Sequence, residues 1–71
     1  MKGFLKRRRK DLKLTAKEMA MRLDSSPSRV FHYETEMRFP TAPDIWTVML
    51  AYEMTKEELL DWLEYINKNN Q

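Results

Sequence analysis

Four polar residues that favour the start of a helix recur along the chain at intervals of eleven to fifteen residues. Thr15 and Thr55 each stand three residues before a glutamate. This spacing is typical of a capping box, in which the hydroxyl and the carboxylate each accept a hydrogen bond from a free backbone amide. Ser26 precedes a proline, which is favoured at the first helical position because an N–H there would have no partner. Thr41 precedes Pro43 and an acidic residue. Signals this closely spaced leave room only for short helices.

The apolar residues between these signals follow the spacing of helical faces, as in Met19, Ala20 and Leu23. Strand signals are missing, because no stretch alternates polar and apolar residues and no Asn-Gly or Asp-Gly turn occurs. The sequence therefore predicts an all-α fold of five helices, over residues 3–12, 16–23, 27–35, 42–53 and 56–68.

At 71 residues the chain has room for one compact domain, residues 1–71, with a core drawn from residues 4–66. It has no cysteine and a single histidine, which excludes disulfides and argues against a structural zinc site. We therefore expect self-association to supply the missing buried surface. The absence of cysteine fits a cytoplasmic location. The longest apolar run, residues 48–52, is too short for a membrane span, and no signal peptide is recognisable.

Charge is divided unevenly along the chain. Residues 1–38 hold eleven basic and five acidic side chains, a balance of +6, whereas residues 39–71 hold two basic and six acidic ones, a balance of −4. This division suggests a basic face for a polyanion and an acidic face turned away from it. The alternative is a basic surface that is merely solvated.

The second and third predicted helices are joined by a short connection, residues 24–26. Ala20 is small enough for the two helices to cross closely, while Val30 and Tyr33 supply apolar contacts beneath. The outside of the third helix then presents Ser26, Ser28, Arg29 and His32. Such a helix fits the major groove of DNA, which is about 12 Å wide, and carries its first side chains to the base edges.

The chain resembles the λ-repressor-like, or Cro/XRE-type, helix-turn-helix family over residues 5–63. The residues that carry this resemblance are Leu5, Arg9, Leu14, Thr15, Met19, Ala20, Leu23, Val30, Tyr33, Glu34, the loop 38–41, Ile45, Val48, Tyr52 and the segment 55–59. The resemblance implies a compact five-helix domain in which helices two and three form the helix-turn-helix. It also implies a regulator of transcription, most often a repressor, that binds a palindromic operator in double-stranded DNA as a homodimer.

The resemblance also assigns roles to individual residues. It implies that Thr15, Ala16 and Lys17 face a phosphate, and that Arg38 lies in a loop touching the DNA backbone. It implies contacts to bases or flanking phosphates from four residues of the recognition helix, namely Ser26, Ser28, Arg29 and His32. An ion pair between the first and third helices is implied for Arg9 and Glu34.

Five positions depart from the family pattern. Asp24, Glu36 and Glu53 stand at or near places where glycine is usual, and Ser25 stands where an apolar residue is usual. We therefore expect altered loops, above all around Glu36. Arg8 replaces an apolar residue, and its stem can cover the core while its head reaches water.

We expect homodimerisation through the last helix, with Trp62, Tyr65 and Ile66 at the interface. Two alternatives remain open. Trp62 can instead close the core of a monomer, or the interface can also include the loop 40–43.

Other functions receive less support from the sequence. No nucleophile motif, glycine-rich phosphate loop or metal-ligand spacing occurs, so we expect no enzyme, no cofactor, no metal and no small-molecule substrate. His32 has no partner at helical spacing, and its alternatives are a DNA contact or a solvent-facing side chain. The basic run 6–10 fits a face along the DNA backbone, a nuclear localisation signal or plain solubility. The alternative function is a protein–protein interaction module built on the same scaffold.

Overall fold

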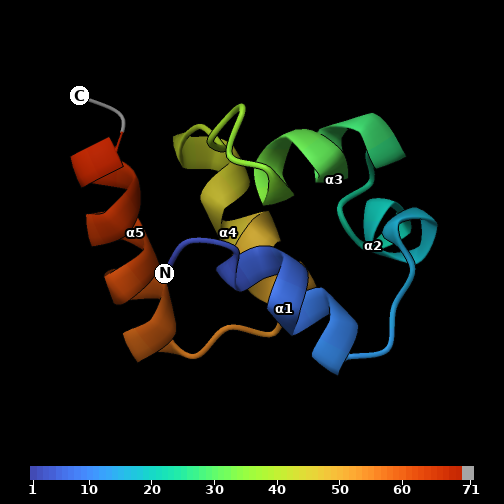
Figure 1. The fold of residues 1–71 in the computed structure, drawn as a ribbon, viewed down its shortest axis with the longest axis horizontal. Coiled ribbons are helices and arrows are strands. Elements are labelled where there is room, and N and C mark those ends of the chain that lie inside the picture. Colours follow the sequence, from blue (N-terminus) through green and yellow to red (C-terminus); the bar gives the residue numbers. More distant parts are fainter. Residues whose placement is uncertain (70–71) are drawn as a thin grey trace.

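The computed structural model describes residues 1–69, which form five α-helices and no strand. The helices are α1 (Phe4–Asp11), α2 (Ala16–Arg22), α3 (Pro27–Glu34), α4 (Ala42–Ala51) and α5 (Lys56–Asn69). Each predicted helix is confirmed, with every boundary within two residues. In Figure 1, α5 stands at one end of the molecule and α2 at the other, with α1 and α4 between them. The helix-turn-helix therefore lies away from the C-terminal helix.

The helix starts follow the signals in the sequence. Thr15 Oγ1 accepts from the Glu18 amide at 3.1 Å, and the Glu18 carboxylate accepts from the Thr15 amide at 2.8 Å. Thr55 and Glu58 form the same box at the start of α5, with distances of 3.1 and 2.9 Å. Ser26 Oγ accepts from the Arg29 amide at 3.3 Å. These contacts satisfy amides that a helix leaves without an internal partner in its first turn.

The first four helices also end alike, although glycine is absent from every one of these ends. Each is followed by a charged residue in the left-handed region, and these are Lys13, Asp24, Glu36 and Glu53, with φ of 60°, 51°, 62° and 51°. The amide after each of them bonds back over the last helical turn, as in Met37 to the His32 carbonyl at 2.9 Å. This is the Schellman ending that glycine usually provides. The expectation of altered loops is wrong, because the backbone keeps this geometry despite the side chains.

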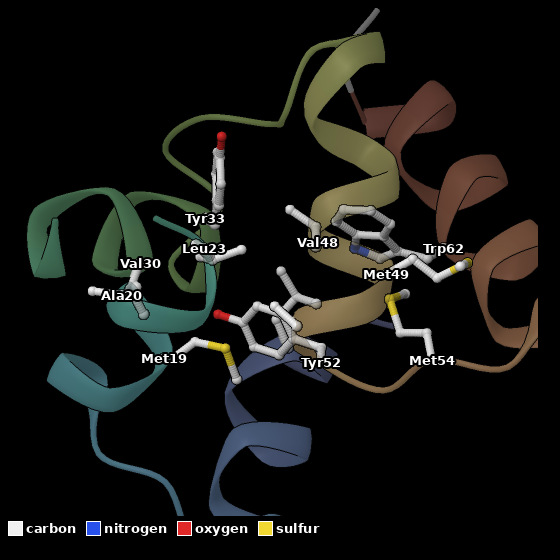
Figure 2. Packing of buried hydrophobic residues seen from close by; sticks show 12 residues of the cluster. Met19, Ala20, Leu23, Val30, Tyr33, Val48, Met49, Tyr52, Met54 and Trp62 are labelled. Carbon is white, nitrogen blue, oxygen red and sulfur yellow. The ribbon is translucent and has the colours of Figure 1, made fainter. Parts of the chain in front are cut away.

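The core lies where α1 to α5 meet and consists of twelve buried apolar residues (Figure 2). They are Leu5, Met19, Ala20, Leu23, Val30, Tyr33, Val48, Met49, Ala51, Tyr52, Met54 and Trp62. Trp62 is only 3% exposed, so its expected place at an interface edge is wrong. Its indole lies near Met49 inside this cluster (Figure 2), because it is on the side of α5 that faces α4. Closing the core of a single copy was the alternative left open for Trp62, and the structure agrees with it.

Two arginines hold the C-terminal end of α4. Arg8 Nη1 donates to the carbonyls of Tyr52 and Glu53 at 3.2 and 2.7 Å, and its Nη2 also bonds the Glu58 carboxylate. Arg22 Nη1 donates to the Ala51 carbonyl at 3.0 Å. A cation here suits the negative end of the helix dipole. Arg8 therefore ties α1 to α4 and α5, and its head bonds within the fold instead of reaching water as expected.

Candidate nucleic-acid interface

Helix α3, the expected recognition helix, is positioned by its packing on α2. Ala20 is 2% exposed and Val30 is fully buried, so the two helices meet closely over a small side chain. The turn between them contains Asp24 in the left-handed region and bonds back to α2, with the Ser25 amide 2.9 Å from the Ala20 carbonyl. This arrangement leaves the opposite side of α3 exposed, as the helix-turn-helix register predicts.

A buried polar cluster fixes the end of α3 against α1 and α4. Arg9 donates to both Glu34 oxygens, from Nε at 2.8 Å and from Nη2 at 3.0 Å. The Tyr52 hydroxyl donates to Glu34 Oε2 at 2.9 Å, and Arg9 Nη1 reaches the Leu14 carbonyl at 3.0 Å. Side chains of Arg9 and Glu34 are 13% and 5% exposed, so little solvent screens the pair. The structure thus contains the ion pair that the resemblance implies.

Tyr52 is the member of this cluster whose polar contact the sequence did not reveal, because the resemblance includes Tyr52 without assigning its hydroxyl a partner. Burial raises the pKa of its hydroxyl far above the ordinary value, and the neighbouring Glu34 acts in the same direction. Hydrogen bonding to Glu34 is the main reason that the pKa of Arg9 is raised. Both effects keep Arg9 charged and Tyr52 protonated, so the cluster stays intact over the physiological pH range.

Five of the predicted DNA contacts line one hollow. Ser26, Ser28, Arg29, His32 and Arg38 surround a space of about 300 Å³ between α3 and the segment that leads into α4. Tyr33, Phe39, Thr41 and Asp44 complete its wall. The structure therefore brings the recognition helix and the Arg38 loop to one surface.

Asp44, in the first turn of α4, faces Arg29 across this hollow and was not singled out in the sequence. Its Oδ2 lies 4.0 Å from Arg29 Nη1, and it accepts from the Thr41 hydroxyl at 3.3 Å. Both members of the pair are about half exposed, at 50% and 47%. An exposed pair of this kind contributes roughly 0–1 kcal/mol, so Arg29 can readily leave Asp44 for another acceptor.

The three residues at the start of α2 lie outside this hollow. Thr15 and Glu18 use two of the first amides of α2 for each other, while Lys17 is exposed. Hydrogen bonds from Thr15, above all from its backbone amide, lower the pKa of the Glu18 carboxyl. Glu18 is therefore an anion at this helix start and repels a phosphate. The positive charge of the neighbouring Lys17 can compensate this repulsion.

The basic half of the chain presents fewer free cations than its sequence suggests. Arg8, Arg9 and Arg22 are engaged in contacts within the fold, and Arg22 also pairs with Glu53 at 2.7 Å. Exposed cations in this half include Lys6, Lys10, Lys13, Lys17 and Arg38. The balance of +6 thus overstates the charge available to a polyanion.

Other side chains define what this surface can do. His32 is half-buried, and its ring lies 6.1 Å from that of Phe31, which is 57% exposed.

No group of acidic, histidine or cysteine side chains in residues 1–69 could hold a metal ion. Over the same residues, no helix is long and apolar enough to cross a membrane.

The three residues that were expected at an interface between copies differ in their burial and in their contacts. Trp62 is buried, the Tyr65 hydroxyl bonds Glu36, and Ile66 packs on the margin of the core. Large apolar side chains that are exposed by 58–64% include Trp46 and Leu50 on α4 and Leu60 on α5. Exposed apolar groups of this size are found at protein contacts.

Comparison with known proteins gives one finding. Residues 5–59 match a family model described as helix-turn-helix, which is more than half of the chain. No curated protein and no solved structure matches the chain. The matched span begins in α1 and ends within α5, so it includes the α2–α3 pair and the hollow beside it.

Proposed function

We propose that this chain, which belongs to the Cro/C1-type helix-turn-helix family of non-enzymatic DNA-binding domains, represses transcription by binding a palindromic operator as a homodimer. The observation that carries the proposal is the hollow lined by Ser26, Ser28, Arg29, His32 and Arg38. All five are donors or cations at a concave surface beside a capped, exposed helix. Such a surface fits the base edges and the flanking phosphates of a major groove.

The proposed division of roles follows from side-chain chemistry. Arg29 presents a planar fork that matches the O6 and N7 acceptors of guanine, and it exchanges its weak partner Asp44 for them. Lys17 and Arg38 neutralise phosphates, which position the protein without reading sequence. Ser26, Ser28 and His32 add contacts from the same helix. The protein acts in the cytoplasm, where the operator lies.

The direct experiment is the selection of binding sites from random duplex DNA, followed by titration of variants on the selected site. Arg29→Ala should relax the preference at one or two base pairs, at a cost of roughly 1–3 kcal/mol. Lys17→Ala should weaken binding to every duplex alike, since a phosphate contact carries no sequence information. Uniform loss of affinity in both variants would make Arg29 a phosphate contact and remove the proposed reader.

We propose homodimerisation because one copy is smaller than the spacing between successive major grooves on one face of a duplex. Residues 1–69 extend 29 × 21 × 21 Å, whereas successive major grooves on one face of a duplex lie about 34 Å apart. One copy therefore reaches one half-site, and a two-fold pair reads a palindrome. For the contact between copies we retain Tyr65 and Ile66 on α5 and add Leu60, which is 64% exposed. Leu60, Leu63 and Ile66 follow one another at three-residue spacing along that helix.

The variant that tests this contact must leave each copy folded. Tyr65→Glu is unsuitable because the new carboxylate would meet Glu36 within the same copy. Leu60→Glu places a charge at an exposed position, and a two-fold interface would contain it twice. We expect this variant to sediment as a folded monomer with weakened operator binding, while Leu50→Glu on α4 remains dimeric. A monomeric unmodified protein at high micromolar concentration, bound as one copy per site, contradicts the proposed dimer.

A protein-interaction module is the second candidate function. The exposed pair Trp46 and Leu50, one turn apart on α4, favours it. The two functions differ in their response to Trp46→Ala, which should abolish binding to a protein partner and leave duplex binding unchanged.

A further inference from the structure

Glu36 occupies a position that is unfavourable for its own backbone. Its φ of 62° lies in the left-handed region, which costs an L residue roughly 1–2 kcal/mol. The backbone is nevertheless held there, because the Met37 and Arg38 amides both donate to the His32 carbonyl, at 2.9 and 3.2 Å. Glycine would adopt this turn without the steric cost. A glutamate here invites the question of what its carboxylate does.

The carboxylate of Glu36 joins three segments that are far apart in sequence. The Tyr65 hydroxyl of α5 donates to Oε1 at 2.5 Å, and the Gly3 amide before α1 donates to Oε2 at 3.2 Å. The hydrogen bond to Glu36 is also the main reason that the pKa of Tyr65 is raised, so the hydroxyl keeps the proton that it donates. The contacts of the Glu36 carboxylate hold the connection between α3 and α4 on the side of α5. The His32 carbonyl, which accepts from the Met37 and Arg38 amides, holds it on the side of α3.

Arg38 follows Glu36 by two residues, and its side chain lines the hollow beside the recognition helix. The connection that presents this guanidinium is therefore fixed at one point by a hydroxyl of the C-terminal helix. The backbone of a helix moves less than a free side chain does. A Glu36 carboxylate that is bonded to α5 therefore restricts the positions that residues 36–38 can take. Residues in such connections are mobile where nothing fixes them.

We propose that Glu36 and Tyr65 are positioning residues for DNA binding, forming a latch through which α5 sets the place of Arg38 at a backbone phosphate. The inference rests on the proposed function, because Arg38 is assigned there to a phosphate. The latch also connects α5 with the segment that carries Arg38. A shift of α5, such as one imposed by a second copy docked on it, changes the contact that Arg38 makes with DNA.

The test is a double-mutant cycle between Tyr65→Phe and Arg38→Ala, read as the Kd for a duplex. Tyr65→Phe removes the hydroxyl and keeps the ring, so it breaks the contact between α5 and Glu36 without changing charge, while the Gly3 amide still bonds the carboxylate. We expect Tyr65→Phe to raise the Kd about three- to tenfold, which corresponds to about 0.6–1.4 kcal/mol, the net contribution of one ordinary hydrogen bond. In the Arg38→Ala background the same substitution should have no further effect, because the side chain that the latch positions is gone.

Two controls separate positioning from general stability. Thr55→Val removes the capping hydroxyl of α5, which weakens the same helix without touching the latch. Its Kd should equal that of the unmodified protein at a temperature where both are folded. Glu36→Gln keeps a carbonyl oxygen as acceptor for the Tyr65 hydroxyl and should bind DNA more tightly than Glu36→Ala. Hydrogen exchange at the Met37 and Arg38 amides, without DNA, should speed up in Tyr65→Phe and remain unchanged in Thr55→Val.

The outcomes are distinguishable. An unchanged Kd for Tyr65→Phe, or an equal loss in the Arg38→Ala background, overturns the latch while leaving the proposed function intact. An Arg38→Ala variant that binds as well as the unmodified chain overturns it as well. Failure of the unmodified chain to bind any duplex defeats the proposed function and the latch's role in binding, and the exchange rates then still report whether Tyr65 holds the connection.

Discussion

At the scale of single residues, arginines have the most varied roles in this chain. Arg9 holds the end of the recognition helix through Glu34, whereas Arg29 meets only an exposed carboxylate 4.0 Å away. The first arrangement is buried and bidentate, so its removal leaves a charge without a partner. The second is solvated and exchangeable. Burial thus separates an arginine that maintains the fold from one that is available to a ligand.

Glu34→Ala tests the structural role of this buried cluster. The substitution leaves the Arg9 guanidinium and the Tyr52 hydroxyl without their acceptor, so we expect a loss of about 3–5 kcal/mol in the free energy of unfolding. A single core in a domain of this size rarely supplies more than about 3–5 kcal/mol, so the variant should be largely unfolded at room temperature. Urea denaturation followed by circular dichroism measures the change. A loss below about 0.5 kcal/mol would be that of an exposed pair and contradicts the buried assignment.

The sequence allowed some of these residue roles to be predicted and concealed others. Ser28, Arg29 and half-buried His32 fall on one side of α3, with Ser26 at its N-cap, because helical periodicity fixes the direction of each side chain. Asp44 was missed because it reaches Arg29 only through the tertiary packing of α4 beside α3. Arg8 was expected to cover the core, but its carbonyl acceptors, 44 and 45 residues away, were not foreseeable from local pattern.

At the scale of helices, the two ends of each element differ in how clearly the sequence marks them. Starts at Thr15, Ser26 and Thr55 are visible because the capping side chain is itself part of the sequence. Ends are hidden here, because each left-handed position carries a charged residue where glycine is usual. The fold keeps the Schellman geometry through backbone hydrogen bonds, so the missing glycines affect stability rather than shape.

Lys13→Gly tests that conclusion at the end of α1. Relief of the left-handed strain, about 1–2 kcal/mol, exceeds the entropic cost of glycine, about 0.5–1 kcal/mol. We expect the free energy of unfolding to rise by roughly 0.5–1 kcal/mol, seen as a higher thermal midpoint. Lys13→Ala is the matched control, because alanine keeps the Cβ and removes the same charge, and it should show no gain. A destabilised glycine variant would mean that the left-handed turn carries no strain.

The capping box at the start of α5 predicts a response to acid. Hydrogen bonding to Glu58, first of all from the Thr55 amide and then from Arg8, lowers the pKa of its carboxyl below the ordinary value of 4.5. The unfolded chain then binds a proton at a higher pH than the folded chain does. The contribution of Glu58 to stability is therefore complete above pH 4.5 and is lost as the pH falls through the folded-state pKa.

Glu58→Gln checks this assignment, because it removes the titrating group and keeps the side-chain length. We expect a lower thermal midpoint than that of the unmodified protein at pH 7, and a smaller drop between pH 5 and pH 3. Glu57→Gln, a neighbouring exposed carboxylate with no resolved capping contact, serves as the control. Parallel pH profiles for the unmodified protein and Glu58→Gln would show that the box does not contribute to acid sensitivity.

At the scale of the whole molecule, function depends on a division of surfaces. The hollow and Arg38 lie on the side of α3, whereas α5 stands apart from α2 (Figure 1). Helix α5 carries exposed acidic residues that include Glu57, Asp61 and Glu64. Five helices and their order were predictable from local signals. Burial of Trp62 was not, because the direction of α5 relative to α4 decides which of its sides is covered.

The salt dependence of duplex binding tests the central claim most directly. With the selected operator and a scrambled duplex of equal length, fluorescence anisotropy gives the observed association constant at each salt concentration. We predict a linear fall of its logarithm with the logarithm of salt, at a slope of about −0.9 per phosphate neutralised, with the operator bound roughly 10³-fold or more tightly than the scrambled duplex. A flat response to salt, or equal affinity for the two duplexes at every salt concentration, contradicts the account.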